Sequence, residues 1–131
     1  MSDYDVIDDL IALVRSECPG LATVEEAWFA SPIDHFDSQT PACLIYLAED
    51  AADEAETMRS VQRVTLSYGL WLVCSRDDFR AQRASIRKVL HGHMFSEQYD
   101  PLSYRGGQTT DIRGEYVWWR EFWTVDTWLH S

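Results

Sequence analysis

The first clear pattern along the chain is a helical one near its start. Apolar side chains recur at a spacing close to 3.6 residues, at Val6, Ile7, Leu10, Ile11 and Val14. This spacing predicts a helix over residues Asp5 to Cys18 with one buried face. The helix is expected to end at Pro19-Gly20.

The middle of the chain predicts strands. Residues Ala42 to Ala48 are apolar at successive positions, which indicates a strand buried on both faces. Residues Val61 to Cys74 alternate, and one face carries Val64, Leu66, Tyr68, Leu70, Leu72 and Cys74. Gly69 is a point at which this long strand is expected to bend. A shorter strand is expected from Val24 to Ala30.

A second helical pattern follows the long strand. Ser75 and Asp78 have the spacing of a helix-capping box, with Asp78 in place of the usual glutamate. We predict a helix from about Asp77 to His91, ended by Gly92. Its inward side chains are Phe79, Ile86, Val89 and Leu90, and its outward side chains are Arg80, Arg83, Arg87 and Lys88.

The C-terminal part of the chain predicts further strands joined by turns. Leu102 to Tyr104 and Gln108 to Ile112 are short strand candidates. Between them, Arg105-Gly106-Gly107 is interpreted as a hairpin turn, because glycine adopts positive φ without strain. Arg113-Gly114 is a second turn, and the final strand runs from Tyr116 to Leu129.

The final strand carries large apolar side chains on both faces. One face holds Val117, Trp119, Trp123, Val125 and Leu129, and the other holds Trp118, Phe122 and Trp128. Trp119 and Trp123 are expected in the core. Trp118 and Trp128 are expected on a surface that binds a partner, with a second core layer as the alternative.

The elements follow in the order α-β-β-β-α-β-β, which predicts an α+β fold. We expect a mixed or antiparallel sheet of about four to five strands with two helices packed on it. The chain of 131 residues is 46% hydrophobic, which predicts a single domain over residues 1–131.

The sequence argues against targeting to a membrane or to the secretory route. Because its start is acidic and it lacks a long apolar run, we expect no secretory signal and no membrane span. Three widely spaced cysteines, Cys18, Cys43 and Cys74, are expected as buried, reduced thiols.

Charge is unevenly distributed along the chain, whose formal net charge is -11. Residues 1–56 hold 14 carboxylates and one basic residue, Arg15, whereas residues 57–131 hold 8 carboxylates and 10 basic residues. An acidic half of this kind repels phosphate, which argues against a DNA-binding module. A single lysine, Lys88, argues against a polybasic membrane surface.

The most acidic stretch runs from Glu49 to Glu56, and its carboxylates are Glu49, Asp50, Asp53, Glu54 and Glu56. It joins two strand candidates, and we predict a solvated loop or a short helix. Since charge runs are usually just exposed, the simplest interpretation is a solvated loop without a function.

Candidate catalytic and metal-binding residues are few. His91 and His93 flank Gly92, and Cys74 is a possible third metal ligand, but a helix end with exposed histidines explains the pair better. Asp34-His35 is interpreted as part of a polar loop, because no nucleophile stands in an elbow motif. We therefore expect no catalytic site, no metal and no cofactor.

A family resemblance covers nearly the whole chain in order and is firmest from Gln62 onward. It rests on four stretches, which are Gln62 to Tyr68 with Leu70 and Leu72-Val73, then Arg83, Ile86-Arg87 and Val89-Leu90 on the second helix, then Pro101 to Gly107, and finally Val117 to Trp119 with Phe122. The first helix and the strand from Pro41 to Leu47 fit more loosely. In these stretches the sequence resembles the small α+β tail terminator proteins of long-tailed bacteriophages. It departs from them at His91 to Phe95, where the family often has a Gly-Trp pair.

The resemblance implies a virion structural protein at the head-proximal end of the tail, assembled in the host cytoplasm. Such a protein forms a hexameric ring, caps the tail tube, ends its polymerisation and offers a joining surface to a head-completion or neck protein. DNA is then passing cargo rather than a specific ligand. For contacts between subunits of the ring, the charge distribution predicts that the acidic N-terminal half binds Arg80, Arg83 and Arg87 of a neighbour. Within such a ring, three roles are open for the acidic stretch from Glu49 to Glu56: it faces the channel of the ring, it contacts a neighbouring subunit, or it has no function. The alternatives are another phage neck or head–tail joining protein, or a small metal- or ligand-binding protein.

Overall fold

The structure is a computed structural model, and it describes residues 4–27, 39–53 and 61–130. Its elements are α1 (Ile7–Glu17), β1 (Thr23–Glu26), β2 (Ala42–Ala52), β3 (Val61–Ser75), α3 (Arg76–Leu90), β4 (Ser103–Arg113) and β5 (Tyr116–His130). This order confirms the predicted α+β fold. The predicted strand from Val24 to Ala30 appears as β1, and residues 28–30 lie outside the described part of the chain.

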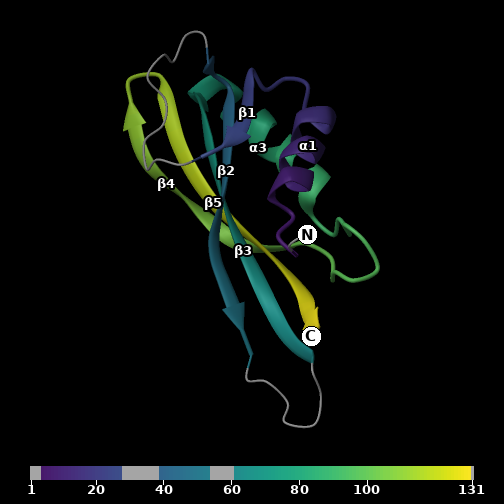
Figure 1. The fold of residues 1–131 in the computed structure, drawn as a ribbon. Helices are drawn as coiled ribbons and strands as arrows, with labels where there is room; N and C mark the ends of the chain where they lie inside the picture. Colours follow the sequence, from purple (N-terminus) through teal and green to yellow (C-terminus); the bar gives the residue numbers. More distant parts are fainter. Residues whose placement is uncertain (1–3, 28–38, 54–60, 131) are drawn as a thin grey trace.

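The five strands form one mixed sheet in the order β1-β2-β3-β5-β4. β1 is parallel to β2, and the remaining neighbours are antiparallel. In Figure 1, α1 and α3 lie together on one face of the sheet, and the far ends of β2, β3 and β5 extend past them. The sheet therefore has one helix-covered face, one face without these helices and a projecting end.

The main core lies between the helices and the sheet. The predicted face of β3, including Leu66, Tyr68, Leu70 and Leu72, packs in one cluster with the buried sides of both helices. Val14 of α1 and Leu90 of α3 are completely buried there. All three cysteines are buried, as predicted. Among the described helices, none is long and apolar enough to cross a lipid bilayer.

A second apolar cluster covers the opposite face of the sheet. It consists of Ala27, Ala42, Leu44, Trp71, Val73 and Trp118. Trp71 and Trp118 meet edge to face, with ring centroids 5.9 Å apart. This cluster explains why β2 is apolar on both faces, as its sequence predicted. It also places Trp118, which is 3% exposed, in the second core layer that was the alternative to a partner surface.

The expected turn at Arg105-Gly106-Gly107 is wrong. These residues lie inside β4, which is one continuous strand instead of two short ones. The pairing of β4 with β5 shifts register between Tyr104 and Gly106, so the positive φ of Gly106 (110°) serves a bulge. Gly107 is required for close approach, because a Cβ there would lie 2.5 Å from Cζ2 of Trp119. The predicted turn at Gly114 is confirmed.

The acidic stretch was also assigned wrongly in its first part. β2 continues through Glu49 to Ala52, where a loop or short helix was expected. After a register shift between Leu47 and Glu49, these residues pair with β3 from Ser67 to Val64. Hydrogen bonding to β3 outweighs the low strand propensity of the acidic residues. Glu54 and Glu56 lie outside the described residues.

Candidate interaction surface

The most distinctive surface feature is a basic groove along α3. It is lined by Arg80, Arg83, Ala84, Arg87, Lys88 and His91 and has a volume of ≈ 580 Å³. These residues recur at the three- and four-residue spacing that places them along one side of a helix. The helix begins as predicted, since Ser75 Oγ accepts a hydrogen bond from the backbone N–H of Asp78.

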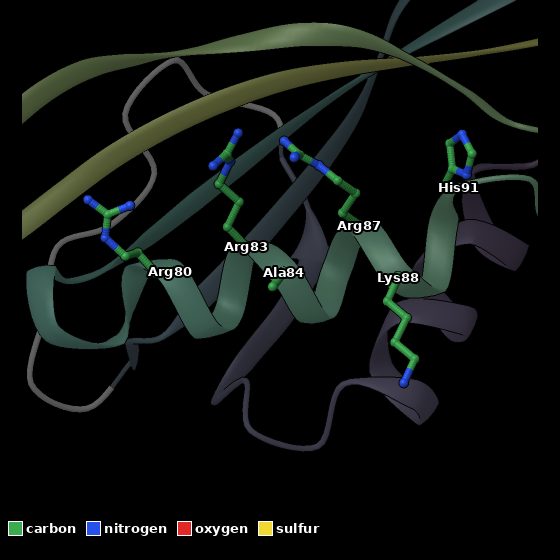
Figure 2. A pocket seen from close by; sticks show the side chains of 6 residues that line it. All are labelled: Arg80, Arg83, Ala84, Arg87, Lys88 and His91. Atoms are coloured by element: carbon green, nitrogen blue, oxygen red, sulfur yellow. The ribbon is translucent and has the colours of Figure 1, made fainter.

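Aromatic rings of the sheet hold two of the guanidinium groups. Arg83 lies over Trp119, 4.7 Å from the ring centroid, and Arg87 lies over Tyr104 at 4.5 Å. In Figure 2 both side chains point from α3 toward β4 and β5, whereas Lys88 points toward α1. The prediction that all the basic residues project outward is therefore wrong for Arg83 and Arg87, which are half-buried. Cation–π attraction between the flat guanidinium groups and the rings explains the difference.

The rings of Tyr104, Trp119 and Trp123 form an aromatic platform beneath the two arginines, and a buried carboxylate fixes it. Glu121 is 1% exposed and accepts hydrogen bonds from the indole nitrogens of Trp119, at 2.7 Å, and Trp123, at 2.5 Å. Tyr104 packs against Trp123, with ring centroids 5.1 Å apart. The sequence analysis did not identify Glu121. Its position midway between Trp119 and Trp123 on the apolar face of β5 was the available signal.

Several buried nitrogens of the groove have no hydrogen-bond partner in the described part of the chain. Among the described residues, none accepts a hydrogen bond from the buried Nε of Arg83 or from the buried Nε and Nη2 of Arg87. Each buried polar group left unpaired costs about 1–3 kcal/mol. The ion pairs found in the described part of the chain involve other arginines, namely Arg63 with Asp126 and Arg113 with Asp111. Arg83 and Arg87 are thus held in place by aromatic rings, without a neutralising carboxylate from the described residues.

The helix-free face ends in a polar network beside an exposed tryptophan. Asp126 pairs with Arg63 and accepts a hydrogen bond of 2.6 Å from Thr65 Oγ1. Burial alone would raise the pKa of the Asp126 carboxyl, but the hydrogen bonds from Thr65 and Arg63 bring it below its ordinary value. Trp128, directly opposite Arg63 on β5, is 50% exposed. Of the two tryptophans expected on a partner surface, Trp128 is the accessible one.

The acidic end of β2 lies apart from the basic groove. Glu49, Asp50 and Asp53 are exposed, and the hydroxyl of Tyr4 donates a hydrogen bond to Asp50. In Figure 1 the far end of β2 projects beyond the helices. The structure does not bring these carboxylates together with Arg83 and Arg87. Those two arginines lie over aromatic rings of β5 and β4 instead.

The remaining candidate residues that the structure describes, His91, His93 and Cys74, do not assemble into a metal site. His91 is exposed, and His93 packs against Phe95 with ring centroids 4.8 Å apart. Cys74 is buried, and burial raises the pKa of its thiol to about 12. In the described part of the chain, no three potential metal ligands gather in one place. Asp34 and His35 lie outside the described residues.

Comparisons with known proteins give a family and a fold. No curated protein matches this chain in sequence. A chain of a structure titled "Virion of native gene transfer agent (GTA) particle" has a similar fold, with a TM-score of 0.54 at 13% sequence identity. The similarity covers 96% of this chain and 87% of that chain. In sequence, residues 1–131 match the family described as phage tail terminator protein. Because this match spans the whole sequence, the protein belongs to the phage tail terminator family.

Proposed function

We propose that this protein forms a hexameric ring at the head-proximal end of the phage tail. The ring binds the last ring of the tail tube, stops its polymerisation and presents a surface to a head-completion or neck protein. Its role is structural rather than catalytic. Assembly takes place in the host cytoplasm, and the finished ring is part of the virion.

The observation that carries this proposal is the family match over residues 1–131. The similarity in fold to a virion chain agrees with it. The surface also supports a role in assembly, because Trp128 and Leu129 are large apolar residues with exposed fractions of 50% and 42%. Exposed aromatic and aliphatic side chains at the end of a strand are typical of interfaces between proteins.

The acidic composition suits a ring through which DNA passes. With a net charge of -11 per chain, a ring of several copies repels the phosphate backbone. At physiological salt this repulsion acts over roughly 8–10 Å. A lining of carboxylates would therefore keep passing DNA mobile without binding it.

A tube-polymerisation experiment tests the proposed function. Purified tail tube protein is allowed to polymerise with and without this protein, and electron microscopy records tube lengths and tube ends. We expect shorter tubes, each carrying a ring at one end. Unchanged tube lengths together with binding to purified capsids would instead identify a neck or head–tail joining protein.

A further inference from the structure

The basic groove of α3 has the properties of a binding site for carboxylates. Arg83 and Arg87 are positioned by the rings beneath them, so their guanidinium groups lose little conformational freedom when a partner binds. Arg80, Lys88 and His91 are exposed along the same groove and add further hydrogen-bond donors. The buried Nε of Arg83 and the buried Nε and Nη2 of Arg87 have no hydrogen-bond acceptor among the described residues, so the described part of the chain does not use up the charge-assisted hydrogen bonds that arginine makes with carboxylates.

The same chain carries a complementary surface at the far end of β2. Glu49, Asp50 and Asp53 are exposed there, and pairing with β3 holds the backbone extended up to Ala52. Glu49 to Asp53 spans about 13 Å at the rise of a strand. Arg80 to Arg87 spans about 10 Å at the rise of a helix. The two charged surfaces are therefore similar in length.

The topology of the sheet keeps these surfaces apart within one subunit. Arg83 and Arg87 contact β5 and β4, and β4 is at one edge of the sheet. β3 and β5 separate β2 from β4, which places the two strands about 14 Å apart at the usual strand spacing. The far end of β2 also projects past the helices (Figure 1). A second copy of the chain can bring such surfaces together where a single copy cannot.

We propose that the α3 groove of one subunit binds the acidic end of β2 of a neighbouring copy. This inference rests on the proposed ring, because contact between two different surfaces of identical subunits is the kind that closes into rings. The net charge of -11 opposes the approach of DNA and of a second copy alike. Carboxylates of a second copy are favoured over DNA phosphates because each added subunit brings one acidic strand end for one groove, so every groove of a closed ring has a matching partner.

Charge reversal on each side, followed by recombination, tests the contact. The groove variant carries Arg80→Glu and Lys88→Glu, which change exposed side chains outside the two ring-stacked arginines. The strand-end variant carries Glu49→Lys and Asp53→Lys. A control carries Asp8→Lys and Asp9→Lys on the exposed side of α1, and it changes the net charge by as much as the strand-end variant. Thermal melts of each variant establish that it is folded.

Sedimentation equilibrium at low and high salt measures self-association, and electron microscopy scores rings on purified tail tubes. We expect each reversed variant to associate at least about tenfold more weakly than the parent at low salt, with a smaller difference at high salt. The protein with all four groove and strand-end substitutions should regain association, and the control should match the parent. Undiminished association of either reversed variant, or no recovery in the combined variant, would overturn the proposal. So would a parent that stays monomeric both alone and on tubes.

Binding of a fluorescent DNA duplex tests whether the groove binds DNA phosphates instead of the carboxylates of a second copy. If the parent binds the duplex through Arg80 and Lys88 while the groove variant still self-associates normally, the groove serves phosphate and the inference is wrong. Tube lengths separate this inference from the proposed function. If the groove variant associates and limits tube growth like the parent, the inferred contact is wrong and the proposed function stands. If the parent itself does not limit tube growth, the proposed function is wrong.

Discussion

The carboxylate of Glu121 and the indole of Trp123 form a buried hydrogen bond of 2.5 Å. The other carboxylate oxygen accepts a hydrogen bond from the indole of Trp119. Trp119 in turn lies beneath the guanidinium group of Arg83. A single acidic side chain inside the core therefore fixes the aromatic platform under a basic groove, which links the stability of the core to the geometry of the groove.

Replacement of Glu121 tests this link. Glu121→Leu leaves the buried indole N–H of Trp123 and the part-buried indole N–H of Trp119 without an acceptor, so we expect the free energy of unfolding to fall by about 2–5 kcal/mol. Glu121→Gln keeps one carbonyl oxygen and should cost less. Urea unfolding followed by tryptophan fluorescence measures both, with Glu115→Gln in the exposed β4–β5 turn as the control. A leucine variant as stable as the parent would mean that the two hydrogen bonds contribute nothing.

The tryptophans of β5 differ in what their removal should do. Trp118 is 3% exposed and packs against Trp71, so Trp118→Ala should destabilise the fold by about 3–5 kcal/mol. Trp128 is 50% exposed, so Trp128→Ala should change stability by less than about 1 kcal/mol. Thermal melts compare the two variants, and sedimentation reports on assembly. Equal destabilisation by the two substitutions would contradict the different burial of the two rings.

The lowered pKa of Asp126 predicts that the stability of the fold depends on pH. Its pKa in the folded protein lies below the ordinary value of about 3.9, so its stabilising effect is fully present above that pH. The effect is lost as the pH falls through the folded pKa, because the carboxylate that pairs with Arg63 becomes protonated. We expect Asp126→Asn to lower the urea midpoint near neutral pH, and the difference from the parent to vanish in acid. Glu97→Gln, at an exposed loop position, is the control. A difference that persists unchanged into acid would exclude this linkage.

Gly107→Ala should damage the platform from the side of β4. The new Cβ would lie 2.5 Å from Cζ2 of Trp119 and 2.9 Å from Cβ of Glu121, so the indole has to move. We expect a loss of about 1–3 kcal/mol in the free energy of unfolding, as for other overpacked positions. Near-ultraviolet circular dichroism should also change as Trp119 shifts. Thr109→Ala, at an exposed position of the same strand, should leave both measurements close to those of the parent.

The sequence by itself determined the elements whose signals are local. The spacing of apolar residues in α1 and the alternation along β3 identify both elements, because burial of one face imposes its own period on the side chains. The cap at Ser75 and the turn at Gly114 were found for a similar reason, since each depends on a few neighbouring residues. The family resemblance was also present in the sequence.

Only the tertiary structure decided the rest, because it depends on residues far apart in the chain. Glu49 to Ala52 form a strand since β3 supplies hydrogen-bond partners, although acidic residues have low strand propensity. Arg83 and Arg87 turn toward the sheet because Trp119 and Tyr104 offer ring faces there. The alternation along β5 separates its two faces but does not say whether the second face is buried as well, and the packing of Trp71 against Trp118 buries that face at Trp118. Pairing between distant segments, rather than local propensity, therefore positions the groove and its platform.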